Sequence, residues 1–144
     1  MSADAEVRDD DSPRRQSRRA AVMLLYQEDI TGHPMDEIIA QHERDAGRPL
    51  PPYARGLIDG VHAGHARLDA EIDERAEGWS VERIAPVERA VLRVGLLELD
   101  ADDPPAAVAI AEAVALARRY ASPEAGTFVN GILGAAARTR GTGR

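Results

Sequence analysis

The chain has 144 residues, a net charge of -7 and 44% hydrophobic residues, which is typical of one globular domain. It contains no cysteine, which excludes disulfides, thiol catalysis and thiolate metal sites. No long apolar run or signal-peptide pattern occurs, so we expect no membrane span and a cytoplasmic protein. Aromatic residues make up only 3%, so the core must consist of aliphatic side chains.

Apolar residues recur at helical spacing along most of the chain, and sustained alternation is absent, which predicts an all-α fold. The expected helices cover residues 13–30, 34–45, 53–76, 84–100, 108–120 and 123–137. Gly60 and Gly64 weaken the third stretch, so we expect a kink or break near residues 61–65 that divides it in two. The sequence therefore predicts a compact bundle of about seven helices, with no internal repeat and no second domain.

The two ends of the chain differ from this pattern. Residues 1–12 are polar and acidic, and we expect them to form a disordered leader. Residues 140–144 are rich in glycine and arginine, and we expect a frayed tail there. The predicted domain therefore covers residues 13–139.

The stretch over residues 84–100 is apolar on most sides of a helix. Such a helix must be surrounded by other elements, so we predict that it is the buried centre of the bundle. Pro86 fits a first-turn position, where a missing N–H is no loss. Trp79, the single tryptophan, precedes this helix and is expected to fill part of the core.

The sequence offers little support for an enzyme, a cofactor or a metal site. His62 and His65 could face one metal ion from a helix, but no third ligand is placed by spacing. The carboxylates between residues 69 and 74 are expected to form a solvated face. No nucleophile is accompanied by a recognisable base, and no glycine-rich phosphate loop follows a strand. We therefore expect a protein that is not an enzyme and binds no cofactor.

Four arginines stand at the start of the first predicted helix: Arg14, Arg15, Arg18 and Arg19. Their spacing places them within about 140° of one helix face. Four cations at a helix N-terminus oppose the helix dipole and repel one another. Two interpretations remain open: a solvated helix start, or a site for an anion such as an RNA backbone with its bases stacked nearby.

Three blocks of the sequence, in this order, resemble the NusB family. They are residues 14–27, residues 86–99, and a segment from residue 109 that ends in Phe128-Val129-Asn130-Gly131-Ile132-Leu133. The resemblance extends from about Arg14 to Ala137 and implies an all-α fold of about seven helices. It also implies a role in transcription antitermination and ribosomal RNA synthesis, in which a NusB-like domain binds boxA-type single-stranded RNA together with the ribosomal protein NusE in the RNA polymerase antitermination complex.

The resemblance also implies site residues in this chain. Those matching RNA-binding positions are Arg14, Arg15, Arg18, Arg19, Glu124 and Phe128. Those matching the face that meets NusE are Tyr26, Glu82 and Glu88. Arg19 stands where relatives can be acidic, and residues 125–127 replace more polar ones. Phe128 could stack on a base or pack in the core.

Two further questions stay open in the sequence. The alternative function is a noncatalytic protein–protein interaction module without RNA affinity of its own. A NusB-like fold also forms the N-terminal domain of some ribosomal RNA cytosine methyltransferases, but these 144 residues leave no room for a nucleotide-binding domain. The oligomeric state could be a monomer or a homodimer.

Overall fold

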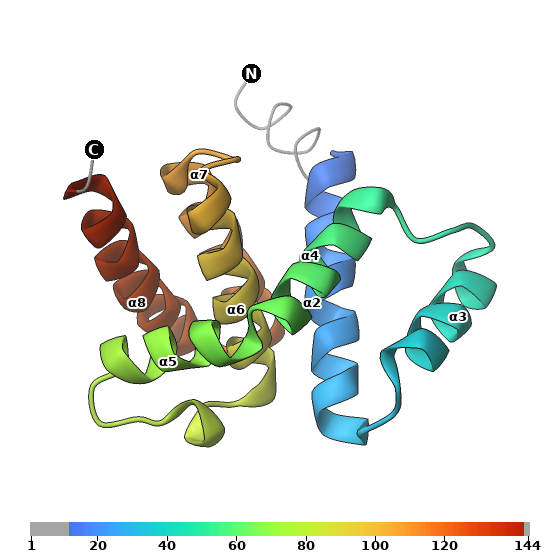
Figure 1. The fold of residues 1–144 in the computed structure, drawn as a ribbon, viewed down its shortest axis with the longest axis horizontal. Helices are drawn as coiled ribbons and strands as arrows, with labels where there is room; N and C mark the ends of the chain where they lie inside the picture. Colours follow the sequence, from blue (N-terminus) through green and yellow to red (C-terminus); the bar gives the residue numbers. More distant parts are fainter. Residues whose placement is uncertain (1–11, 143–144) are drawn as a thin grey trace.

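The computed structural model describes residues 12–142, in which seven α-helices and one short 3-10 helix form the regular structure (Figure 1). The elements are α2 (Pro13–Thr31), α3 (Met35–Ala46), α4 (Pro52–Ala63), α5 (His65–Arg75), η1 (Val81–Arg83), α6 (Pro86–Ala101), α7 (Ala106–Tyr120) and α8 (Pro123–Thr142). Residues 12–142 contain no strand, and the predicted all-α fold is confirmed.

Local signals set most helix ends where the sequence predicted them. The Ser12 hydroxyl caps α2 by accepting a hydrogen bond from the Arg15 N–H at 3.2 Å. At its other end α2 stops at Gly32, whose φ of 73° lies in the left-handed region that favours glycine. The predicted break between two helices occurs at Gly64, between α4 and α5.

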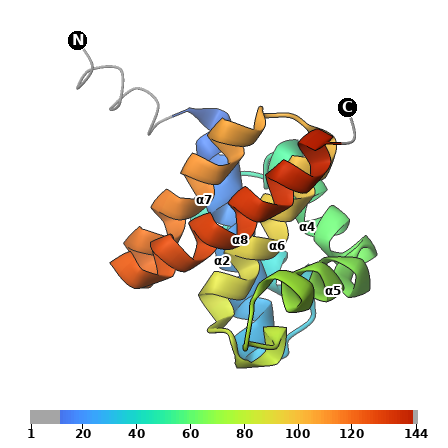
Figure 2. The ribbon, with the colours of Figure 1, turned by 90° about the vertical axis from the view of Figure 1, so that its left-hand side faces the viewer.

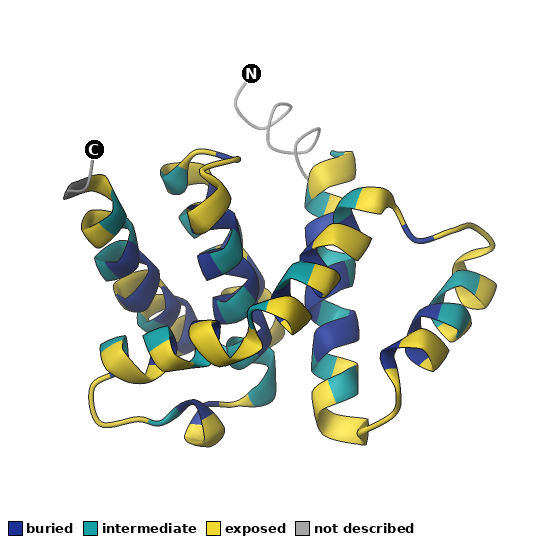
Figure 3. Cartoon of the chain, in the orientation of Figure 1, coloured by how far each residue is buried: buried dark blue, intermediate teal, exposed yellow. Residues whose placement is uncertain are grey.

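Helix α6 is the buried centre of the bundle, as predicted. It packs against α2, α4, α5, α7 and α8. Val91, Leu92 and Leu96 are at most 1% exposed. In Figure 2, α7 and α8 lie side by side across α6, and Figure 3 shows buried positions on the inward sides of the helices. Helix α3 stands at the edge of the fold and packs mainly on α2.

The C-terminal end of the fold differs from the expected frayed tail. Helix α8 continues through Arg140 to Thr142. Arg140 donates hydrogen bonds to Glu71 of α5 at 2.7 and 2.8 Å and to Asp100 of α6 at 2.7 and 3.0 Å. These ion pairs hold the helix end against two neighbours, so the helical domain extends beyond residue 139. Residues 143–144, and residues 1–11 of the expected leader, lie outside the described part of the chain.

The prediction that Trp79 fills the core is wrong. Its side chain is 53% exposed. It follows Gly78, whose φ of 80° turns the chain between α5 and η1, and the guanidinium of Arg83 lies 6.0 Å from the centre of its ring. The aliphatic side chains of the helices fill the core without it.

Within residues 12–142, none of the helices combines the length and the apolar character needed to cross a lipid bilayer.

Candidate nucleic-acid interface

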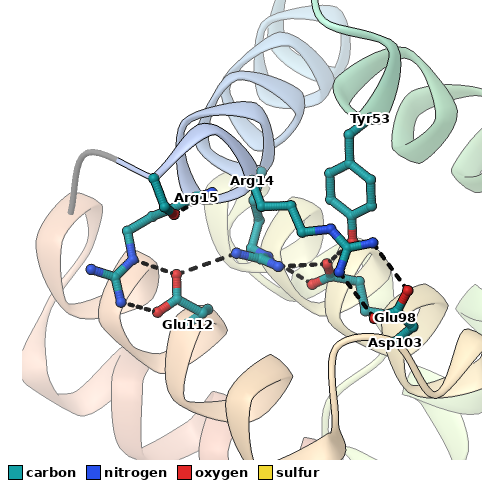
Figure 4. Close-up of polar contacts among 8 residues, drawn as sticks. Arg14, Arg15, Tyr53, Glu98, Asp103 and Glu112 are labelled. Atoms are coloured by element: carbon teal, nitrogen blue, oxygen red, sulfur yellow. Dashed lines mark hydrogen bonds and ion pairs between the residues drawn. The ribbon is translucent and has the colours of Figure 1, made fainter. Parts of the chain in front are cut away.

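Helix α2 places its four arginines at the edge where it meets α6 and α7. The helix runs antiparallel to α6. Two ion pairs show this: Arg18 with Glu98 at one end of the helix, and Asp29 with Arg89 at the other. The middle of α2 packs into the core. The arginine-bearing first turns therefore lie at one end of the bundle, beside the C-terminal half of α6 and the first half of α7 (Figure 4).

Arg18 is buried in an ion pair with Glu98. Its Nε and Nη2 atoms each lie 2.8 Å from a carboxylate oxygen, and the two residues are 4% and 2% exposed. Burial disfavours the charged guanidinium, yet hydrogen bonding and the charge of Glu98 outweigh it and raise the pKa of Arg18. The Tyr53 hydroxyl also donates to Glu98, and Arg18 donates to Glu112 at 3.2 Å. Arg18 therefore has little surface to offer a ligand.

Arg14 is the most accessible of the three arginines of α2 that form ion pairs. It forms a two-pronged ion pair with Asp103, at 3.0 and 3.1 Å, and its guanidinium lies 4.3 Å from the centre of the Tyr53 ring. The hydrogen bonds from Arg14 lower the pKa of Asp103 and raise that of Arg14 itself. Because both side chains are exposed, this pair contributes little stability, and the Arg14 guanidinium stays accessible from solvent.

Arg15 and Arg19 line a groove between α2 and α7, and Arg19 also lines a second cavity on the side of α3. Arg15 donates from Nε to Glu112 at 2.6 Å and makes a second hydrogen bond to the same carboxylate. Glu112 therefore bridges Arg15 and Arg18. Arg19 is partly buried, and its Nε atom has no hydrogen-bond partner within the described residues.

Glu124 and Phe128 do not join the arginines. They line a separate cavity of about 390 Å³ between the start of α8 and the start of α6, together with Glu88 and the exposed Trp79. Phe128 is partly buried and packs against the core. Burial raises the pKa of Glu88. One cavity thus brings together two residues expected to bind RNA and one expected to bind a protein partner.

Tyr26 and Glu82 lie toward the end of α2 that is remote from Arg14. Tyr26 is partly buried against the core, and Glu82 is exposed in η1. Arg89 links the two elements, since it donates to the Glu82 carbonyl oxygen at 3.0 Å and to Asp29 at 2.8 and 3.0 Å. The expected partner-binding residues therefore lie along the second half of α2, η1 and the start of α6.

Residues 15–138 match the sequence pattern of the NusB family. The chain belongs to the NusB family. It is 41% identical over 121 residues to the transcription antitermination protein NusB of Rubrobacter xylanophilus, a match that covers 83% of this chain and 86% of the relative. It is 42% identical over 126 residues to the protein of the same name from Saccharopolyspora erythraea, with 84% of each covered.

Solved structures agree with this membership. T. maritima NusB superposes with a TM-score of 0.78 and 33% identity over 88% of this chain and 92% of that one. A chain from the crystal structure of the antitermination factors NusB and NusE in complex with double-stranded RNA superposes with a TM-score of 0.78. The two sequences are 27% identical, and the match covers 88% of this chain and 96% of that one. The expectation that the chain is not an enzyme is confirmed, because the NusB family comprises non-enzymatic antitermination factors.

Sequence reasoning did not identify the carboxylates that hold the arginines. Glu98 and Glu112 each stand in a strongly apolar stretch of a helix, in α6 and α7 respectively. An isolated carboxylate at such a position signals a buried cation as its partner, because an unpaired buried charge is too costly to keep. That signal was present in this NusB-family sequence, but nothing local indicated that α2 supplies the cation.

Proposed function

We propose that this chain is a transcription antitermination and ribosomal RNA synthesis factor that binds boxA-type single-stranded RNA together with NusE, in the cytoplasm and within the RNA polymerase antitermination complex. The observation that carries this proposal is the similarity, over 88% of the chain, to a protein solved in complex with NusE and RNA. The proposed RNA surface is the start of α2, and the proposed NusE surface comprises Tyr26, Glu82 and Glu88.

The electrostatics at the start of α2 support RNA as the ligand. Among residues 12–142, four arginines stand there, and three of them pair with three carboxylates, those of Glu98, Asp103 and Glu112. Within those residues, the excess of positive over negative side chains around the start of α2 favours an anion, although the full sequence carries a net charge of -7. The exposed guanidinium of Arg14 beside the Tyr53 ring adds a surface on which phosphate contact and base stacking can be combined.

One observation favours the alternative of a protein–protein module without RNA affinity. Arg14, Arg15 and Arg18 each already have a carboxylate partner. A helix start that is exposed to water, with its arginines paired to the protein's own carboxylates, would show the same ion pairs without binding RNA. The two candidates differ in whether RNA can replace Asp103 or Glu112 as the partner of a guanidinium.

The test is a titration of boxA-type RNA with the full chain, with and without NusE, at several salt concentrations. Each phosphate contact is expected to contribute about -0.7 to the slope of log affinity against log salt on a single strand. Arg14→Glu and Arg15→Glu should weaken binding strongly, whereas Arg44→Glu on the exposed side of α3 makes the same charge change at a distance and should not. Arg18 is left intact, because reversing its charge would bury two carboxylates against each other.

Retained NusE binding, with no RNA affinity even when NusE is present, would support the protein–protein module instead. A duplex of the same sequence, used as a second probe, distinguishes single-stranded from double-stranded preference.

A further inference from the structure

A small groove of about 130 Å³ separates the first turns of α2 from the second half of α7. Arg15, Arg18 and Arg19 line it from α2, and Arg119 lines it from α7. The same groove contains one carboxylate, that of Glu112. Among the residues that the structure describes, four arginines and one acidic side chain thus line this groove.

Among the described residues, the carboxylates at this groove pair with Arg15 and Arg18 only. Glu112 is held by Arg15 and Arg18, and Arg18 is held in addition by Glu98. Neither Arg19 nor Arg119 forms an ion pair with any described residue. The Nε atom of Arg19 is buried without a hydrogen-bond partner in that part of the chain, and the guanidinium of Arg119 rests 5.3 Å from the centre of the Tyr120 ring.

General helix physics explains part of this arrangement. A cation in the last turn of α7 is favoured by the helix dipole, so an arginine at position 119 is unremarkable by itself. The dipole does not explain why Arg119 lines the same groove as Arg19, where two like charges repel. The buried Nε–H of Arg19, which has no acceptor within the described residues, adds a second cost to this side chain. An anion in the groove would relieve the repulsion between the two guanidinium groups.

The groove also lies between the two segments expected to contact RNA. Arg15, in the first turn of α2, lines the groove itself. Arg119 is four residues before Pro123, where α8 begins and leads to Glu124 and Phe128. A polyanion that touches both segments has a continuous path across Arg119.

We propose that Arg19 and Arg119 form a phosphate-binding site for the RNA backbone, which joins the arginine cluster of α2 to the start of α8. The site rests on the proposed RNA-binding function. Guanidinium groups are suited to it because they donate paired N–H groups to phosphate oxygens. The paired arginines Arg15 and Arg18 form its positively charged wall. Arg19 and Arg119, which form no ion pair with residues 12–142, supply the direct contacts.

The experiment compares Arg119→Gln, Arg19→Gln and the double variant with the wild type, in titrations of boxA-type RNA over a range of salt concentrations with NusE present. Arg44→Gln is the matched control, since it removes one positive charge from an exposed position on α3. Each groove variant should weaken RNA binding at low salt and make the salt slope shallower by about 0.7, with the double variant adding the two effects. Arg119 is exposed, so its variant should keep the thermal midpoint of the wild type.

Wild-type affinity and slope in Arg119→Gln, combined with loss of binding in Arg15→Glu, would overturn this proposal while leaving the proposed function intact. Absence of RNA binding by the wild-type protein would instead contradict the proposed function. A loss of NusE affinity in Arg119→Gln, with unchanged RNA affinity of the preformed complex, would assign the groove to an acidic protein surface and would also overturn the proposal.

Discussion

Nε and Nη2 of Arg18 each lie 2.8 Å from an oxygen of Glu98, and this ion pair joins α2 to α6 inside the protein. Its position changes what charge-reversal experiments on the arginine cluster can mean. A variant that includes Arg18 tests the fold together with the ligand, whereas variants of Arg14 or Arg119 test the surface.

Arg18→Met should lower the free energy of unfolding by about 3–5 kcal/mol, because it leaves Glu98 buried with an unpaired charge. Replacing both residues, Arg18→Met with Glu98→Leu, should recover much of that loss, since no isolated charge then remains. Urea unfolding followed by circular dichroism measures all three proteins. Equal urea midpoints for the wild type and Arg18→Met would contradict the assignment of a buried, stabilising pair.

Much of the fold could be predicted because its signals are local. Ser12 and Pro13 begin α2, Gly64 divides α4 from α5, and both effects act within a few residues. The pairing of Arg18 with Glu98 joins positions 80 residues apart, so it depends on how α2 packs against α6 and no local pattern encodes it. The prediction for Trp79 was wrong because it used only the size of the side chain. The tertiary fold places this residue in a turn at the surface, where it is exposed.

The candidate site could be predicted less well than the fold. The arginines of α2 were visible as an unfavourable charge cluster. Arg119 stands in the last turn of α7, where a cation suits the helix dipole, and only the tertiary fold brings it to the same groove as Arg19. The resemblance assigned Glu88 to the NusE surface and Phe128 to the RNA surface, whereas the structure places both residues in one cavity.

The Tyr53 hydroxyl predicts a change of stability at alkaline pH. Burial, with the hydrogen bond and charge of Glu98, raises the pKa of Tyr53 from 10.0 to about 12. Folding therefore favours the protonated phenol. Its contribution to the free energy of unfolding is complete below pH 10.0 and is lost as the pH rises from there through about 12. Tyr53→Phe should be less stable at neutral pH by about 1–3 kcal/mol, because Glu98 loses a donor.

Urea unfolding of the wild type and of Tyr53→Phe across this pH range checks the prediction. The difference between the two proteins should shrink as the phenol titrates. A constant difference from neutral pH to pH 12 would show that the hydroxyl does not act through its proton.

Glu88 predicts a pH-dependent affinity for the protein partner. Its pKa is raised by burial, so it loses its charge at a higher pH than an ordinary glutamate as the solution is acidified. If its carboxylate meets a basic surface of NusE, affinity should fall as the pH drops toward mildly acidic values. Glu88→Gln should bind NusE more weakly at neutral pH and should lack this pH dependence, as measured by isothermal titration calorimetry.

Glu37→Gln provides the comparison, because it removes the same charge from an exposed position on α3. It should retain both the affinity and the pH profile of the wild type. Identical profiles for the wild type and Glu88→Gln would remove Glu88 from the proposed NusE surface.

Two glycines predict opposite effects of the same substitution. A Cβ atom at Gly95 of α6 would lie 2.7 Å from Cδ1 of Leu133, a fully buried side chain of α8. Gly95→Ala should therefore destabilise the protein by about 1–3 kcal/mol, because Leu133 must move within a packed core.

Gly131 lies on the exposed face of α8, and a Cβ there meets no atom within 4 Å. Gly131→Ala should stabilise the helix by about 0.5–1 kcal/mol, because alanine loses less backbone freedom on folding. Urea midpoints that shift in the same direction for both variants would contradict the close packing of α6 against α8 at Gly95.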